Sequence, residues 1–129
     1  MAKAFEEMGF KIYATEHTAE ALRAAGISTV SVLRKVKEVD ANPNILDYLQ
    51  ERKIDLVINV PMGNKRKSYS DVLTDGYIIR RQAVEFNVPV ITNLELASAL
   101  VKVLQQKGTD NVTIRSLNEY MDDLPWKLW

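Results

Sequence analysis

Short apolar runs alternate along the chain with longer amphipathic stretches, and this alternation sets the elements we expect. Over residues 16–25, Thr18, Ala21, Leu22 and Ala25 recur at the i, i+3, i+4, i+7 spacing of one apolar helix face. Similar spacing, with capping and terminating residues at the ends, predicts further helices over 2–8, 45–52, 75–86 and 94–106.

The β-rich runs between these helices predict strands. They span residues 10–15, 28–33, 54–60 and 88–91, with a weaker candidate over 111–115. The run over 54–60 is largely apolar without alternation, which is typical of a strand buried on both faces of a parallel sheet. Strands that alternate with helices predict an α/β fold, here a three-layer, Rossmann-like open parallel sheet with helices on both faces.

A chain of 129 residues suffices for one domain of ordinary size. We expect this domain over residues 1–116 and a C-terminal tail over 117–129, with a short helix followed by an irregular end. The long, basic connection over 61–74 is of a length that in compact domains is usually functional or mobile.

Charge and composition narrow the function classes. Lys and Arg together number 17, as do Asp and Glu, so the formal net charge is zero, which weighs against a nucleic-acid or membrane partner. The chain has no Cys and a single His, His17, so thiol nucleophiles, Cys-based metal sites and zinc sites with several imidazoles are excluded. We therefore expect no metal site. Without an apolar run of membrane-spanning length or a signal peptide, we also expect a cytoplasmic protein.

Polar side chains gather where the predicted strands end. In open α/β sheets, ligands bind beyond the carboxyl ends of the strands. Small hydrogen-bonding groups at helix starts, together with a lysine, suit a phosphate or carboxylate, because free N–H groups and the helix dipole face the anion. The sequence therefore predicts an effector or anion site made of Thr15, Thr18, Lys35, Asn59, Pro61, Thr92 and Asn93.

Simpler interpretations exist for most of these residues. Thr15 and Asn93 each precede a predicted helix and can be plain N-caps. Asn59 differs, because a polar amide at the end of a buried strand needs a hydrogen-bond partner. For Arg80 and Arg81, in the middle of a helix, we expect one solvated and one paired side chain.

Four segments, taken in order, carry a resemblance to a known family. They are Gly9-Phe-Lys-Ile-Tyr-Ala-Thr-Glu-His-Thr18, Ile54-Asp-Leu-Val-Ile-Asn-Val-Pro61, Gly76-Tyr-Ile-Ile-Arg-Arg-Gln-Ala83 and Val88-Pro-Val-Ile-Thr-Asn93. The set resembles the methylglyoxal-synthase-like domain family over about residues 5–106. Within that family it is most similar to the C-terminal allosteric domains of carbamoyl phosphate synthetase large subunits, which act in arginine and pyrimidine biosynthesis.

The resemblance implies a regulatory domain without catalytic residues or a cofactor of its own. Its ligand would be a small anionic effector: UMP, IMP or N-acetylglutamate in the family, with ornithine a further effector. Thr15, Thr18, Lys35 and Asn59 match the family's effector-pocket positions. The parent enzyme would be a ligase using ATP with Mg²⁺ or Mn²⁺. The partners would be the remaining domains of the large subunit and a glutaminase subunit. Asn59-Val60-Pro61 is closer to the N-acetylglutamate version, whereas Met62-Gly63 departs from it.

Methylglyoxal synthase itself, a lyase acting on dihydroxyacetone phosphate, is the alternative. The resemblance places its general base at Asn42 and its histidine at Val72, and neither side chain can perform that chemistry. Only Asp75 matches a synthase aspartate. A purine cyclohydrolase relative ranks lower, because it typically has a Gly-rich turn where Thr15–Thr18 stands. A pure assembly module that uses the aromatic tail Trp126–Trp129 is a third hypothesis.

The family also begins with a central strand that precedes the first helix, and this chain starts inside that helix. A missing central strand leaves two unpaired edges, which favour aggregation. We therefore expect a second copy, a swapped segment or residues 111–115 to shield the gap, or the fold to be rearranged.

Overall fold

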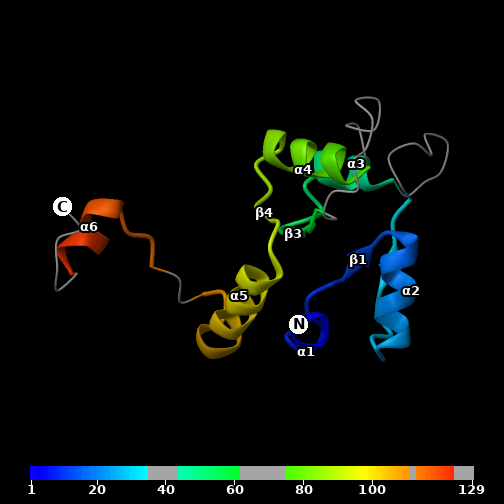
Figure 1. The fold of residues 1–129 in the computed structure, drawn as a ribbon, viewed down its shortest axis with the longest axis horizontal. Coiled ribbons are helices and arrows are strands. Elements are labelled where there is room, and N and C mark those ends of the chain that lie inside the picture. Colours follow the sequence, from blue (N-terminus) through cyan, green and yellow to red (C-terminus); the bar gives the residue numbers. More distant parts are fainter. Residues whose placement is uncertain (35–43, 62–74, 111–112, 124–129) are drawn as a thin grey trace.

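The computed structural model describes residues 1–34, 44–61, 75–110 and 113–123. Helices and short strands alternate along these ranges (Figure 1). In chain order they are α1 (Ala2–Glu7), β1 (Tyr13–Ala14), α2 (Glu16–Ala24), β2 (Ser31–Val32), α3 (Ile45–Gln50), β3 (Val57–Ile58), α4 (Asp75–Glu85), β4 (Val90–Ile91), α5 (Leu94–Lys107) and α6 (Leu117–Asp122). Each predicted helix is present, and the first four predicted strands are present in shorter form.

The strands form two parallel pairs. β1 pairs with β2 in the register Tyr13↔Ser31, and β3 pairs with β4 in the register Val57↔Val90. Parallel strands joined through helices are the arrangement expected of a Rossmann-like open sheet. The predicted α/β class is therefore confirmed.

Each pair uses only one edge of β1 and β3. The N–H groups of Ser31 and Leu33 donate to the carbonyls of Ile12 and Ala14 at 2.9 Å. Peptide groups alternate between the two edges of a strand, so the peptide groups of Tyr13 face away from β2. The same reasoning directs the peptide groups of Ile58 away from β4, because Val57 and Asn59 donate to that strand.

The other edges of β1 and β3 have no strand partner among the described residues. The described part of the predicted strand over 111–115 does not fill this place: residues 113–115 are not a strand, and Ile114 is 94% exposed. Residues 111–112 lie outside the described residues. In Figure 1 the described segment before α6 lies away from both strand pairs. A second copy or a swapped segment as the shield stays a prediction.

Two small hydrophobic clusters hold the helices on the strands. One joins α3, β3 and α4 through Leu49, Val57, Ile79, Ala83 and Val88. The other joins α2 to the segment before β2 through Ala19, Ile27 and Val30. An edge-to-face contact between the rings of Tyr13 and Tyr48, with centroids 5.2 Å apart, links β1 to α3.

The buried face of α2 differs from the predicted one. Ala19 is fully buried and Leu22 half-buried, whereas Thr18, Ala21 and Ala25 are exposed. A methyl side chain at position 19 lets the helix backbone approach β1 and β2 closely, so the contact face centres on Ala19. The face of α2 predicted from the apolar spacing was therefore wrong.

Near its start, the chain is fixed by a polar contact. Thr29 donates to Oε1 of Glu6 from its hydroxyl and from its backbone N–H, the latter at 3.1 Å. Hydrogen bonds to the carboxylate favour its charged form, so the pKa of Glu6 is lowered from its ordinary value. The contact ties α1 to the turn before β2.

The tail helix α6 begins with a capping box, in which Ser116 and Glu119 each accept a hydrogen bond from the other's backbone N–H. It buries no residue and lies apart from the other helices in Figure 1. The boundary between 116 and 117 stays a prediction, and Trp126 and Trp129 lie outside the described residues. No helix within the described ranges has the length and apolar character needed to cross a bilayer.

Hydrogen exchange of two amides tests whether the open edges are shielded. If a second copy or swapped segment covers them, we expect the N–H groups of Tyr13 and Ile58 to be protected as strongly as that of Asn59, which donates within the ladder. Exchange read by NMR, with the oligomeric state measured on the same sample, gives the comparison. Rapid exchange of both amides beside a protected Asn59 would contradict the shielding.

Candidate functional site

Thr15 lies between β1 and α2, at the carboxyl end of its strand. It is the N-cap residue of α2, with φ −69° and ψ 158°, and its carbonyl accepts from the N–H of Ala19 at 2.8 Å. Its side chain makes no capping hydrogen bond. The plain N-cap interpretation therefore describes the backbone of Thr15 but gives its hydroxyl no role.

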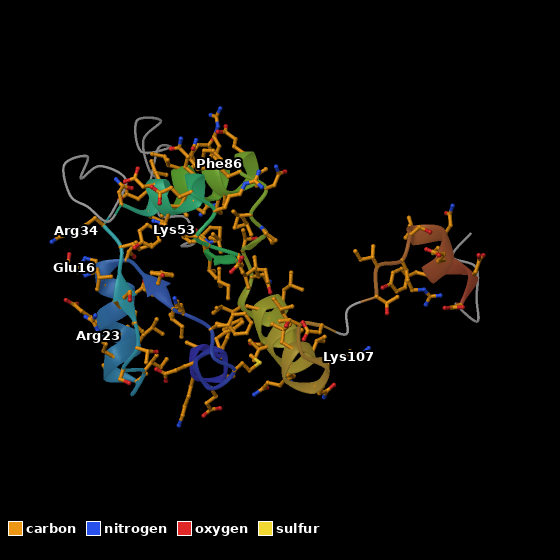
Figure 2. All side chains as sticks on the ribbon, turned by 180° about the vertical axis from the view of Figure 1, so that it is seen from behind. Glu16, Arg23, Arg34, Lys53, Phe86 and Lys107 are labelled. Carbon is orange, nitrogen blue, oxygen red and sulfur yellow. The ribbon has the colours of Figure 1, made fainter. Side chains whose placement is uncertain are left out.

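The neighbouring residues define this end of the first strand pair. Thr18 lies on the exposed surface, in the first turn of α2. Glu16 directly follows Thr15 in the sequence, and Arg34 directly follows Leu33. Figure 2 shows Glu16 and Arg34 toward the same end of the β1–β2 pair, and Arg23 further along α2. The guanidinium group of Arg23 donates to the carbonyl of Val30 at 2.9 Å and not to Thr15.

The second strand pair brings Asn59 beside Thr92. The N–H of Asn59 donates to the carbonyl of Ile91 at 2.9 Å, and Thr92 directly follows Ile91. The side chain of Asn93 accepts from the N–H of Leu96 at 2.8 Å, which is ordinary N-cap geometry for α5. Asn93 therefore serves the helix, as its simpler interpretation predicts. Thr92 and Pro61 are exposed.

The partner that Asn59 needs is Arg80. Nη1 of Arg80, on α4, donates to Oδ1 of Asn59 at 2.6 Å, and both residues are half-buried. Arg81 is instead exposed and pairs with Glu85 at 3.1 Å, which raises the pKa of Arg81. Both arginines are therefore paired, and the expected contrast between them holds only for exposure: Arg81 is exposed, whereas Arg80 is half-buried.

Sequence reasoning did not place Arg80 in the site. A usable signal lay in the helix period: Ile79 and Ala83, one before and three after Arg80, are apolar and are buried against β3. Arg80 therefore borders the face that meets the strand, whereas Arg81 is turned away from it.

The first turn of α4 closes around the Asn59–Arg80 pair. A Cβ atom added to Gly76 would lie 3.2 Å from Nη1 of Arg80 and 3.3 Å from Oδ1 of Asn59. Glycine permits this close approach of the helix backbone. Next to it, Oδ1 of Asp75 is buried and has no hydrogen-bond partner among the described residues.

Other predicted positions lie outside the described residues: Lys35, and also Asn42 and Val72, on which the lyase alternative depends. The structure brings Asn59 together with Thr92 and, separately, sets Thr15 and Thr18 on one helix end. Convergence of the two groups in one pocket with Lys35 stays a prediction.

A surface pocket of about 200 Å³ lies elsewhere, at the opposite ends of β3 and β4. It is lined by Arg52, Ile54, Asp55, Phe86, Asn87, Val88 and Pro89. Residues 54–55 and 88–89 precede the two strands, whereas ligands of open α/β sheets bind beyond the carboxyl ends. The pocket contains none of the predicted site residues, and we assign it no role.

Comparison with known families agrees with this architecture. The family model described as the MGS-like domain matches residues 1–92, more than half of the chain. Helices alternate with parallel strands over the described part of that range, as the fold requires. The chain belongs to the MGS-like domain family.

Three relatives of known description indicate the kind of protein in which this domain occurs. The chain is 42% identical over 119 residues to a protein of Methanocaldococcus jannaschii described as the carbamoyl phosphate synthase large chain, C-terminal section. It is 40% identical over 119 residues to a protein of the same description from Methanopyrus kandleri. Identity to the carbamoyl phosphate synthase large chain of Clostridium perfringens is 38% over 118 residues.

Each of these three alignments covers 92% of this chain, but only 18%, 20% and 10% of the respective relative. The chain is thus similar to one section of much longer proteins. The two archaeal relatives are themselves described as C-terminal sections of a carbamoyl phosphate synthase large chain, which agrees with the subfamily that the sequence motifs indicate.

Two cap positions give a matched test of these side-chain roles. Asn93→Ala removes a side-chain cap and should lower the free energy of unfolding by about 1 kcal/mol. Thr15→Ala removes a hydroxyl that caps nothing, so we expect a much smaller change. Urea unfolding of both variants beside the wild type measures the difference. An equal loss of stability in the two variants would show that the Thr15 hydroxyl also caps its helix.

Proposed function

We propose that this chain is a regulatory module of a carbamoyl phosphate synthase large chain and that it binds a small anionic effector. The observation that carries the proposal is its 42% identity, over 92% of its length, to a protein described as the C-terminal section of such a chain. The effector would bind at the carboxyl ends of β1 and β3.

The chemistry of the candidate site supports an anionic ligand. Thr15 and Thr18 offer hydroxyls at the start of α2, where backbone N–H groups and the positive end of the helix dipole favour negative charge. Asn59 offers an amide, and Lys35 would add a positive charge. None of these residues is a carboxylate, so the set binds an anion without a group that abstracts a proton from carbon.

The remaining expectations belong to this proposal. The parent enzyme would be an ATP-dependent ligase with Mg²⁺ or Mn²⁺, in arginine and pyrimidine biosynthesis, with a glutaminase subunit as partner and a cytoplasmic location. Effector binding would act on distant catalytic domains through a coupling free energy of about 1–3 kcal/mol. Such coupling requires those domains, whereas binding itself is measurable on this chain.

One observation favours a second candidate function, that of a lyase. A carboxylate oxygen of Asp75 is buried without a hydrogen-bond partner among the described residues, and Asp75 is the position that matches a synthase aspartate. A lyase acting on dihydroxyacetone phosphate would use such a group near a held phosphate. An assay for methylglyoxal separates the candidates, because robust turnover would overturn the regulatory proposal.

A thermal-shift panel tests the proposed function directly. The compounds are UMP, IMP, ornithine, N-acetylglutamate and inorganic phosphate. We expect at least one anion to raise the melting temperature, since a ligand that binds only the folded state stabilises it. Thr15→Ala and Lys35→Ala should each reduce that shift with little change in the melting temperature of the free protein.

Two results would contradict the proposal. If no compound shifts the melting temperature, the third hypothesis, an assembly module, is favoured. If Thr15→Ala or Lys35→Ala unfolds the domain and leaves the affinity unchanged, the binding roles assigned to these residues are wrong.

A further inference from the structure

The hydrogen bond between Arg80 and Asn59 sets which end of the Asn59 side-chain amide faces the candidate site. We infer that Arg80 is a positioning residue, which holds the Asn59 amide so that its Nδ2 group, and not its carbonyl oxygen, is presented to the anionic ligand. The inference rests on the proposed function for the ligand, and it adds a residue that acts through Asn59.

The orientation follows from the chemistry of the pair. A guanidinium group has only donors, so the atom of Asn59 that meets Nη1 at 2.6 Å has to be the oxygen. The amide is planar, so its nitrogen points away from the oxygen and from Arg80. An amide oxygen facing the site would repel a phosphate or carboxylate, whereas the two N–H donors of Nδ2 attract one.

Both partners are anchored before any ligand binds. Asn59 is fixed through its backbone N–H, which donates to Ile91 in the β3–β4 ladder. Arg80 is fixed by α4, whose Ile79 and Ala83 belong to the same core cluster as Val57 of β3. An amide held in this way loses little further freedom on binding, which favours affinity.

Gly76 lets the backbone of α4 lie close to the pair. An added Cβ would lie within 3.3 Å of both Nη1 of Arg80 and Oδ1 of Asn59, and 3.6 Å from Nδ2. The first turn of α4 therefore packs against the oxygen side of the amide more closely than against its nitrogen side. Rotation of the amide by half a turn is disfavoured by the hydrogen bond, because it would place Nδ2, a donor, against the Nη1 donor of Arg80.

The first experiment needs no ligand. In Asn59→Asp a carboxylate replaces the amide beside Arg80, and an opposite charge at hydrogen-bond distance lowers a carboxyl pKa by about 1–3. We expect the NMR-titrated pKa of the introduced carboxyl to be lower by about 1 or more than in the double variant Asn59→Asp, Arg80→Met. Equal pKa values in the two variants would overturn the pairing, whatever the ligand.

The second experiment measures binding of UMP and inorganic phosphate by calorimetry. We expect Arg80→Met to weaken binding by about tenfold, Arg80→Lys to restore most of it, and Asn59→Asp to abolish it. Arg81→Met is the matched control: Arg81 is the next residue of the same helix, exposed and paired with Glu85, so the affinity should not change. An equal loss in Arg81→Met would show that helix charge, and not positioning, is responsible.

A double-mutant cycle separates positioning from direct contact. If Arg80 acts through Asn59, Arg80→Met should have no further effect on affinity in an Asn59→Ala background. An additive loss would overturn the positioning role and assign Arg80 to the ligand itself. Gly76→Ala adds a variant that keeps both side chains, and it should weaken binding by crowding the pair.

The two experiments also separate this inference from the proposed function. Normal binding in Arg80→Met, with UMP or phosphate bound by the wild type, would overturn the inference alone. If the pKa difference is found but neither compound binds the wild type, the proposed anionic ligand is wrong. The Arg80–Asn59 pairing would then stand, and the role of Nδ2 in binding an anion would be overturned.

Discussion

A polar amide at the end of a buried strand has to be paired, and this requirement organises the half of the domain that contains β3 and α4. Asn59 meets it with Arg80, at 2.6 Å, while its backbone continues the ladder to Ile91. Because Asn59 is half-buried, the hydrogen bond satisfies an amide oxygen that is only partly accessible to water. The pairing also fixes the α4 side of the candidate site, because Gly76 lies against the same two side chains.

The described strands form two separate pairs, and the predicted site residues are distributed between them. Thr15 and Thr18 belong to the β1–β2 half, and Asn59 and Thr92 belong to the β3–β4 half. The Tyr13–Tyr48 contact connects the halves without a shared strand. A ligand that used donors from both halves would join them as well, so binding and closure of the fold would reinforce each other.

Helix positions and fold class could be predicted because apolar spacing and the alternation of elements are local signals. The side-chain roles were harder: Thr15 and Asn93 both precede helices, yet only the Asn93 side chain caps. The face of α2 was wrong because a tight contact through Ala19, and not apolar area, sets it. The helix period could have placed Arg80 beside the buried face of α4, but it could not have identified Asn59, 21 residues away, as its partner.

The central claim is that an anion binds at the carboxyl ends of the strands. The most direct measurement is an NMR titration of the ¹⁵N-labelled chain with UMP, N-acetylglutamate and inorganic phosphate in parallel. The account predicts that the largest shifts fall on the backbone amides of Thr15 and Thr18 and on the side-chain amide of Asn59. Shifts confined to the opposite strand ends, around Phe86 and Val88, or no shifts with any of the three compounds, would contradict it.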